Sequence, residues 1–459
     1  MAEPLWSAEA ISAATGGTAS AAFEVSGVTF DSREVVLGDL FIALKGAATD
    51  GHKFLPDVVA RGAAGAIVSA PADVPNVRVE DTTAALNALA VAARDRTQAT
   101  IIGVTGSVGK TGTKEALFAA LSRSAPGRTH RSVKSYNNHT GVPLSLSRMP
   151  ASSLYAVLEM GMNHAGELAA LTQLVRPHIA IITAIAPAHT EFFSGVEAIA
   201  DAKAEIFQGL EAGGTAIIPF DSPHRDRLIR AARGCAARII TFGTAEGADI
   251  CPLESMRTAT GGTFVTARMM TRELSFTINQ PGAHWVSNAM AVLAAAEAAG
   301  ADVGLAGLAL AELGGLPGRG ARFLAPIGEG TALVIDESYN ANPSSMQATL
   351  AVLGAEPAAR KIAVLGEMKE LGPDSAGYHA ALADPVKAAG VTKAILVGSG
   401  MAPLANALEG RIDFVHVPDA AAARQALTKV LAPGDAVLIK GSNGVGLATV
   451  VAGLQNGTA

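Results

Sequence analysis

Short runs of apolar residues alternate with longer helical stretches along most of the chain. The clearest run, TIIGVT at 100–105, leads into a glycine-rich loop and a helix that we expect to start near Thr111. The runs SLYAVLE, HIAIITAI and GTAIIP follow at 153–159, 178–185 and 214–219, each separated by a helical segment. Apolar strands that alternate with helices predict a doubly wound parallel sheet in this part of the chain.

The pattern changes on both sides of this block. Before it, the strand-like runs FIALKG at 41–46 and AAGAIVS at 63–69 stand among alanine-rich helical stretches. After it, alternating polar and apolar residues between about 245 and 280 predict a small antiparallel sheet. A helix is expected from about His284 to Ala299.

A glycine-dense segment, GGLPGRGAR at 314–322, is the best candidate for a hinge. Beyond it, five more strand-like runs alternate with helices, as in a second doubly wound domain: TALVIDE, KIAVLGE, KAILVGS, DFVHVPD and DAVLIKG. We therefore predict three α/β domains, which suits a chain of 459 residues. These are a small N-terminal domain (1–98), a central P-loop domain with the added antiparallel sheet (99–316), and a Rossmann-like C-terminal domain (317–459).

The composition narrows the class of protein. Hydrophobic residues make up 49% of the chain but aromatic residues only 4%, so the core must be built from Ala, Val, Leu and Ile. A formal net charge of -6 argues against a nucleic-acid-binding protein. Two cysteines, Cys235 and Cys251, are too few for a disulfide framework and fit a reducing cytosol. Neither a secretory signal nor an apolar run of about 18 residues is found, so we expect a cytoplasmic protein without membrane insertion.

The strongest chemical signal is the segment TGSVGKTGTKE, which follows a buried strand. Gly106 and Gly109 allow a tight turn whose backbone approaches phosphate oxygens, Lys110 supplies a positive charge, and Thr111 offers a hydroxyl to Mg²⁺. The strict P-loop pattern requires glycine where this chain has Val104, so an ordinary strand-to-helix turn stays an alternative. A phosphate loop alone is compatible with a kinase, a motor-like NTPase module or a ligase.

Two polar residues follow strand ends of the same predicted sheet. Glu159 ends one strand and His189 follows the next, where the ligand crevice of an open α/β sheet lies. A carboxylate there could hold a metal ion beside the phosphates. Simpler interpretations are a solvated acid for Glu159 and a structural or exposed side chain for His189. Lys203 has the pattern of an ordinary surface lysine on a helix of mixed polarity.

Taken together, these segments resemble the Mur ligase family over essentially the full length of the chain. The motifs that carry the resemblance are, in order, DSREVVLGDLFIALKG with DGHKF, TGSVGKTGTKE, YNNHTGVPLSL, LEMGMNHAGEL, ITAIAPAHTEFF with ADAKAEIF, GAHWVSNAMAVLAA, VIDESYNANPSSMQATL, LGEMKELG and LIKGSNG. Their order and spacing are specific. YNANPSSM and GEMKELG favour the member that adds a dipeptide, and the Asp-Asn-Pro-Arg motif of the diamino-acid-adding member is absent.

The resemblance implies an ATP-dependent amide ligase that joins D-alanyl-D-alanine to UDP-N-acetylmuramoyl-tripeptide through an acyl phosphate. This reaction is the last cytoplasmic peptide-adding step of peptidoglycan precursor synthesis. The N-terminal domain would bind the UDP substrate, and the central domain would bind ATP with two Mg²⁺ ions. The C-terminal domain would bind the dipeptide and close over ATP, in a monomer. Alternatives are a diamino-acid-adding or folylpolyglutamate-like ligase of the same architecture, a P-loop kinase and a nucleotide-regulated binding module.

The resemblance also implies roles for individual residues. Those at the UDP substrate would be Ser32 and Arg33 near uracil and phosphate, and Asn137, Asn138 and Thr140 near the muramoyl sugar. Those at ATP would be Gly106, Ser107, Gly109, Lys110, Thr111, Asn288, Arg319, Asp336 and Asn340. The Mg²⁺ ligands would be Thr111, Glu159, His189 and a CO₂-derived carbamate on Lys203, and the catalytic set would be Lys110, Glu159, His189 and Lys203. The chain departs from the family pattern after His284 and after the serine of LIKGSNG, so the roles of Trp285 and Lys440 stay open.

Overall fold

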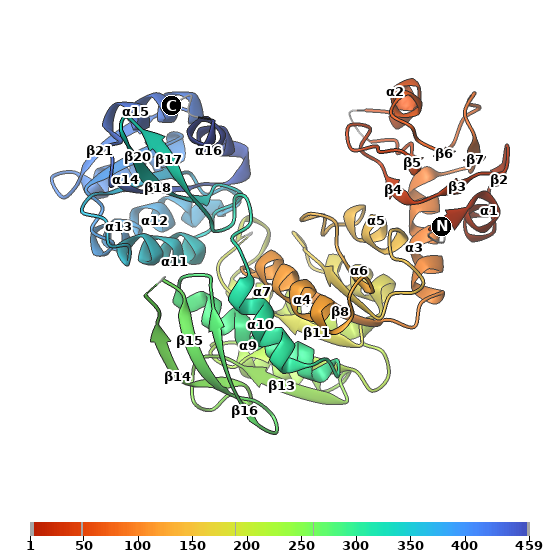
Figure 1. Ribbon diagram of the computed structural model, residues 1–459, viewed down its shortest axis with the longest axis horizontal. Helices are drawn as coiled ribbons and strands as arrows, with labels where there is room; N and C mark the ends of the chain where they lie inside the picture. Colours follow the sequence, from red (N-terminus) through yellow and green to blue (C-terminus); the bar gives the residue numbers. More distant parts are fainter. Residues whose placement is uncertain (1–3, 47–48, 189, 260, 457–459) are drawn as a thin grey trace.

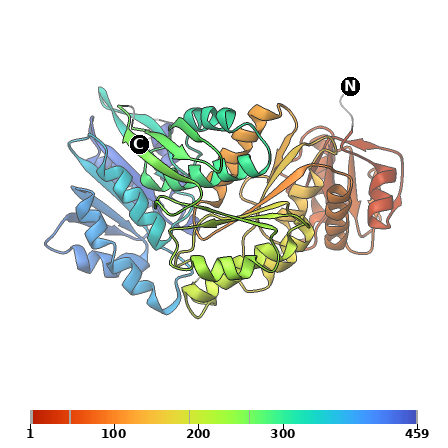
Figure 2. The same ribbon diagram turned by 90° about the horizontal axis from the view of Figure 1, so that it is seen from below.

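The computed structural model describes residues 4–46, 49–188, 190–259 and 261–456. The chain folds into three α/β domains, with the central domain between the other two (Figures 1 and 2). The predicted fold class is confirmed, whereas the exact domain limits at 98/99 and 316/317 stay predictions. Among the described residues, none of the helices has the length and apolar content that a membrane span requires.

The N-terminal domain is built on a five-stranded sheet in the order β2-β7-β6-β5-β4, parallel except for β2, with the pair β1-β3 beside it. The strands are β1 (Trp6–Ser7), β2 (Thr18–Ala19), β3 (Glu24–Val25), β4 (Gly27–Thr29), β5 (Asp39–Ile42), β6 (Gly65–Val68) and β7 (Asn76–Arg78). The helices are α1 (Ala8–Thr15), η1 (Gly51–Phe54), α2 (Leu55–Ala60) and α3 (Thr82–Asp95). Both predicted strand-like runs are confirmed as strands, although β5 ends at Ile42.

The central domain contains a six-stranded parallel sheet in the order β13-β12-β11-β8-β10-β9. Its strands are β8 (Thr100–Thr105), β9 (Thr129–Arg131), β10 (Tyr155–Glu159), β11 (Ile179–Ile182), β12 (Thr215–Pro219) and β13 (Arg238–Phe242). The helices are α4 (Lys110–Ser124), α5 (Gly141–Ser147), α6 (Glu167–Val175), η2 (Thr190–Phe192), α7 (Val196–Ala204), η3 (Glu205–Gly209), α8 (Arg225–Ala232), α9 (Ala283–Ala298) and α10 (Val303–Glu312).

Helices cover both faces of this sheet. Ile101 of β8 packs into a core with α5, α6, α7 and α8, whereas Ile102 and Val104 pack on the opposite face with α4, α9 and α10. Burial on both faces explains why the strands read as uninterrupted apolar runs. The chain crosses from β8 to β10 on one side and then to β11 on the other, so the crevice at the carboxyl end of β8 is the expected ligand site.

The predicted antiparallel sheet is also confirmed. Its strands, in the order β14-β15-β16, are β14 (Cys251–Arg257), β15 (Thr263–Arg268) and β16 (Glu273–Ile278). The buried face of this sheet joins the core around α9 and α10. Helix α9 begins and ends within one residue of the prediction.

The C-terminal domain has a six-stranded mixed sheet in the order β17-β18-β22-β19-β20-β21. Its strands are β17 (Ala321–Ile327), β18 (Gly330–Glu337), β19 (Lys361–Gly366), β20 (Lys393–Val397), β21 (Asp413–Val417) and β22 (Ala436–Lys440). The helices are α11 (Pro343–Gly354), η4 (Gly372–Asp374), α12 (Ser375–Ala380), α13 (Ala383–Ala388), η5 (Ser399–Met401), α14 (Ala402–Leu408), α15 (Ala420–Val430), η6 (Asn443–Val445) and α16 (Ala448–Gln455). Strand β17, which the sequence pattern does not predict, pairs antiparallel with β18 at the edge of the sheet.

Candidate active site

The phosphate loop connects β8 to α4 and has a backbone that depends on its glycines. Gly106 and Gly109 have φ angles of +151° and +86°. A Cβ atom at Gly106 would lie 2.0 Å from Thr183 Oγ1, so a larger residue would displace the loop. Lys110 Nζ donates a hydrogen bond to the Gly106 carbonyl (2.6 Å). The first N–H groups of α4 have no acceptor within their own helix, which makes this loop a suitable anion site.

Charges around Lys110 come from both sides of the cavity that it lines. Burial lowers the pKa of Lys110, Glu159 opposes the shift, and Arg319 reinforces it. A polyanion such as a triphosphate would add negative charge to this partly desolvated cationic site. The loop therefore favours phosphate binding over the alternative of an ordinary strand-to-helix turn.

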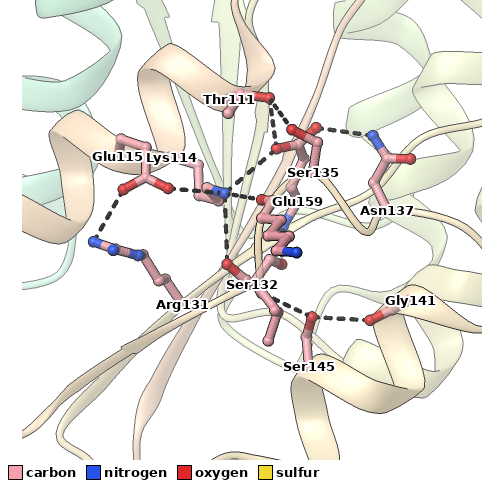
Figure 3. A network of polar contacts seen from close by, with 12 residues as sticks. Thr111, Lys114, Glu115, Arg131, Ser132, Ser135, Asn137, Gly141, Ser145 and Glu159 are labelled. Atoms are coloured by element: carbon pink, nitrogen blue, oxygen red, sulfur yellow. Dashed lines mark hydrogen bonds and ion pairs between the residues drawn. The ribbon is translucent and has the colours of Figure 1, made fainter. Parts of the chain in front are cut away.

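Thr111, Ser135 and Asn137 surround the carboxylate of Glu159 (Figure 3). Thr111 Oγ1 donates to Glu159 Oε2 (2.9 Å), and Asn137 Nδ2 donates to Glu159 Oε1 (2.8 Å). Ser135 Oγ lies 3.5 Å from Thr111 Oγ1. The side chain of Glu159 is only 1% exposed, which contradicts the alternative of a solvated strand-end acid.

The donor set around Glu159 fits a magnesium ion that is shared with phosphate oxygens. Mg²⁺ commonly binds one or two carboxylates together with water and substrate phosphates, rather than a cage of protein ligands. Within the described ranges, no group of three or more His, Cys, Asp or Glu side chains is placed to hold a metal. Thr111 and Glu159 supply hard oxygen ligands at the helix end where the phosphates would lie. His189, the third predicted ligand, lies outside the described residues.

A cavity of about 490 Å³ opens from the phosphate loop toward the C-terminal domain. Its lining includes these predicted site residues: Ser107, Gly109, Lys110, Thr111, Asn137, Glu159, Asn288, Arg319 and Asn340. Trp285 also lines the cavity, and its ring covers Gly112 at the start of α4, with Cη2 3.2 Å from where a Cβ atom would stand. The cavity therefore combines phosphate-binding groups from one domain with polar groups from another.

Arg319, in the predicted hinge, links the two sides of the cavity. Its guanidinium lies 4.1 Å from the centre of the Tyr339 ring, and its Nη2 donates to Ser135 Oγ (3.3 Å). One arginine thus contacts the C-terminal domain and the loop beside Glu159.

The strand-end charges of the C-terminal domain are bonded to protein groups. Asp336 is buried and does not line the cavity: Gly318 N donates to its Oδ2 (2.7 Å), and Ser338 N and Oγ donate to its Oδ1 (3.1 and 2.7 Å). Lys440, a cavity residue, donates to the Asn340 carbonyl (2.9 Å) and lies 3.5 Å from Glu337. Burial lowers the pKa of Lys440. The predicted contact of Asp336 with ATP stays a prediction.

The interpretation of Lys203 as a surface lysine is wrong. The side chain lies on α7 and is 1% exposed. Burial, together with the charge of Lys110, holds the pKa of Lys203 well below its ordinary value. The side chain does not line the cavity. The fold therefore provides an amine that is shifted toward its neutral form.

The predicted UDP-substrate residues other than Asn137 lie outside the cavity. The Arg33 side chain is 84% exposed and donates two hydrogen bonds to the carboxylate of Asp31 (2.9 and 2.6 Å), beside Ser32. Asn138 Oδ1 accepts from Gly141 N (2.9 Å) and from Thr140 Oγ1 (3.1 Å), at the start of α5.

Several residues at the site were not predicted from the sequence. They are Lys114 and Ser135 near Glu159, and Glu337 and Tyr339 on the C-terminal side of the cavity. Lys114 follows Lys110 by one helical turn, so helical periodicity places both on one face of α4. The sequence of α4 does not show, however, that the buried part of this face carries a lysine with polar partners.

Comparison with known proteins gives matches along most of the chain. Three family models match: "Mur ligase family, catalytic domain" at 24–101, "Mur ligase middle domain" at 104–296, and "Mur ligase, glutamate ligase domain" at 323–443. The UDP-N-acetylmuramoyl-tripeptide–D-alanyl-D-alanine ligase of Escherichia coli strain K12 is 34% identical, over 94% of this chain and 94% of that protein. The enzyme of the same name from Rickettsia prowazekii strain Madrid E is 32% identical, over 97% and 99%.

Solved structures of MurF proteins also match nearly the whole chain. A crystal structure of MurF from Acinetobacter baumannii is 31% identical and has a TM-score of 0.83, with 99% of both chains covered. MurF ligase from Thermotoga maritima, solved in complex with ADP, is 26% identical with a TM-score of 0.76, and 94% of this chain and 98% of that chain are covered.

Proposed function

The chain belongs to the Mur ligase family, and on this premise we propose that it uses ATP to join D-alanyl-D-alanine to UDP-N-acetylmuramoyl-tripeptide. The observation that carries the proposal is the cavity in which the phosphate loop faces the segment 337–342 of the C-terminal domain. Relatives of this specificity match over nearly the whole chain, which favours this activity over a kinase or a binding module.

In the proposed reaction, a terminal carboxylate oxygen of the tripeptide attacks the γ-phosphorus of ATP, and ADP leaves. The dipeptide amine then attacks the acyl carbon of the acyl phosphate, loses a proton, and expels inorganic phosphate. Lys110 and the N–H groups of the phosphate loop neutralise charge on the transferring phosphoryl group. Closure of the C-terminal domain, through the hinge that carries Arg319, would exclude the water that hydrolyses acyl phosphates.

We propose that Thr111 and Glu159 hold Mg²⁺, together with His189 as the family resemblance implies. When bound, the metal would neutralise phosphate charge and orient the phosphates. The hydrogen bonds from Thr111 and Asn137 fix the Glu159 carboxylate before any ligand arrives. This preorganisation supports the assignment.

We also propose that Lys203 carries a carbamate. The neutral amine nitrogen would bond to the carbon of CO₂ and release one proton. Deep burial and a lowered pKa favour the neutral amine that this reaction requires. A carbamate would also replace the repulsion between Lys203 and Lys110 by an attraction.

The remaining assignments are proposals of the same kind. The N-terminal domain would bind the UDP substrate through Ser32 and Arg33, with Asn137, Asn138 and Thr140 near the sugar. Asn288 would contact adenine, with Asp336 and Asn340 toward ATP from the C-terminal domain. We propose that the chain acts in the cytoplasm as a monomer. Light scattering during gel filtration would measure its mass.

The test of this function is phosphate release from ATP with Mg²⁺ and UDP-N-acetylmuramoyl-tripeptide, measured with and without D-alanyl-D-alanine. We expect release that depends on the dipeptide and equals the amide product mole for mole. A diamino acid and glutamate serve as alternative amines. Phosphate release that does not depend on the dipeptide would reject the proposal. A higher rate with the diamino acid or with glutamate than with the dipeptide would also reject it.

A further inference from the structure

The loop formed by residues 132–138 lies between β9 and α5 and contacts the N-terminal domain. The Tyr136 hydroxyl donates to Glu34 Oε1 (3.1 Å), and the Lys134 ammonium forms an ion pair with the same carboxylate. Glu34 follows the segment that contains Ser32 and Arg33. The loop therefore borders the proposed UDP-substrate segment.

The same loop contacts the phosphate site and the hinge. Ser135 accepts a hydrogen bond from Arg319 and lies 3.5 Å from Thr111 Oγ1. Asn137 donates to Glu159. Contacts from all three domains thus converge on one short loop, and the placement of the loop affects both proposed magnesium ligands.

Lys114 attaches this loop to α4 (Figure 3). Its side chain is 0% exposed, and its ammonium donates to the Lys134 carbonyl and lies 3.5 Å from the Ser132 carbonyl. The same ammonium lies 3.0 Å from Glu115 and 3.8 Å from Glu159. A buried cation is tolerated only when its donors and charge are matched, and oxygen atoms surround this one.

The backbone at Lys134 explains why the loop needs this attachment. Lys134 has a φ of +48°, in the left-handed region that a non-glycine residue rarely adopts. A residue held there is strained, and the surrounding structure must offset that strain. The hydrogen bond from Lys114 to the Lys134 carbonyl is one contact that does so. Arg131, 2.9 Å from Glu115, in turn fixes the carboxylate beside Lys114.

We propose that Lys114 is a positioning residue for the ligase reaction. It holds loop 132–138 against α4 so that Ser135 and Asn137 orient Thr111 and Glu159 for the metal–nucleotide complex. The inference rests on the proposed function, because it gives Thr111 and Glu159 their role at the metal. Lys114 would thus support the reaction without contact with the substrate or the metal.

The first test is equilibrium binding of Mn²⁺ in the presence of ADP, followed by the electron paramagnetic resonance signal of free Mn²⁺. Lys114→Met keeps an unbranched side chain of similar length and removes the charge and the donors. We expect Mn²⁺ binding to weaken by about tenfold or more, as for other residues that orient metal ligands. Lys114→Gln, which keeps N–H donors, should show a smaller loss, and the exposed Lys387→Met is the matched control.

Steady-state kinetics separate positioning from a purely structural role. For Lys114→Met, we expect a lower kcat and a higher KM for Mg²⁺, whereas the KM for the dipeptide changes less than about threefold. A structural lysine would lower the melting temperature and the active fraction but leave the Mn²⁺ affinity of each active site unchanged. That result would overturn the proposal.

A second variant keeps the test decisive if Lys114→Met does not fold. Glu115→Gln leaves the lysine in place and weakens one of the contacts that fix it. About a threefold loss of Mn²⁺ affinity supports the proposal, and unchanged affinity overturns it. Because Mn²⁺ and ADP binding requires no turnover, a wild-type protein without dipeptide-dependent phosphate release would instead reject the proposed function.

Discussion

The central and C-terminal sheets both present charged side chains at the carboxyl ends of their parallel strands, yet the two edges differ in how these side chains are placed relative to the cavity. At the central edge, Lys110 and Glu159 line the cavity, and the first N–H groups of α4 have no acceptor within their own helix. At the C-terminal edge, protein donors bond to both carboxylate oxygens of Asp336, and Lys440 binds a carbonyl and a carboxylate of its own domain.

This difference shows that two similar sheets can have different roles at one site: the first supplies ligand-binding groups, and the second supports the structure around them. At the central edge, Lys110 and Glu159 line the cavity although protein groups also bond them. At the C-terminal edge, Asp336 lies outside the cavity and fixes the hinge at Gly318, and Lys440 fixes the cavity wall at Asn340. Substitutions at the first edge should therefore impair activity more than stability. Substitutions at the second edge should impair stability as well.

The largest effect is expected for Lys110→Ala. Loss of the charge that neutralises the phosphoryl group should lower kcat/KM by about a thousandfold or more. The melting temperature should not fall, because the variant removes a partly desolvated ammonium along with its hydrogen bond to Gly106. Dipeptide-dependent phosphate release and differential scanning fluorimetry measure the two quantities, with Lys387→Ala as the control. Near-normal turnover of Lys110→Ala would show that the central edge does not supply the charge that the reaction requires.

Lys203→Ala should have the next largest effect. Without the carbamate, turnover should fall by about a hundredfold, as for the loss of a residue that supports a metal site. Added acetate or formate should restore part of the activity by placing a carboxylate in the vacated space. Lys203→Arg cannot form the carbamate and fills the space, so it should stay inactive with acetate. A fully active Lys203→Ala would reject the carbamate and leave the family assignment intact.

At the C-terminal edge, Asp336→Asn tests whether the Asp336 carboxylate stabilises the fold. The asparagine amide nitrogen would face Gly318 N in one orientation and Ser338 N in the other, so either orientation places two donors face to face in a buried site. An unsatisfied buried donor has a cost of about 1–3 kcal/mol, so the melting temperature should fall by several degrees. If stability were unchanged while activity disappeared, Asp336 would instead act on the nucleotide directly.

The smallest effect is expected for Trp285→Phe, at the boundary between the two edges. Phenylalanine keeps an aromatic face over Gly112 but covers less of the cavity, so the KM for ATP should rise by about threefold. The KM for the dipeptide should not change. An equal rise in both would indicate a general distortion of the cavity rather than a contact with the nucleotide.

Much of the fold could be predicted because strands buried on both faces appear as continuous apolar runs. The strands at 100–105 and 155–159 were found from such runs, and the antiparallel sheet was found from alternating polar and apolar residues. Strand β17 was not, because it starts inside the glycine-rich hinge, contains Pro326, and alternates between exposed and partly buried residues at a sheet edge. Its direction depends on pairing with β18, which local sequence does not encode.

The site could be predicted where chemistry follows a strand end, as at Lys110, Thr111 and Glu159. The sequence did not indicate that Lys114 and Lys203 are buried, because a lysine on a helix normally reads as a solvated residue. The burial of Lys114 depends on residues 132–138, which reach α4 from a separate part of the chain. The closing contact of Arg319 with Ser135 likewise depends on the packing of two domains.

The most direct test of the central claim follows an oxygen atom. UDP-N-acetylmuramoyl-tripeptide labelled with ¹⁸O in both oxygens of its terminal carboxylate is incubated with ATP, Mg²⁺ and D-alanyl-D-alanine. If a carboxylate oxygen attacks the γ-phosphorus held at the phosphate loop, each phosphate released with the amide product carries one ¹⁸O atom. Phosphate without ¹⁸O would show that the phosphoryl group passes to water, and would contradict the account.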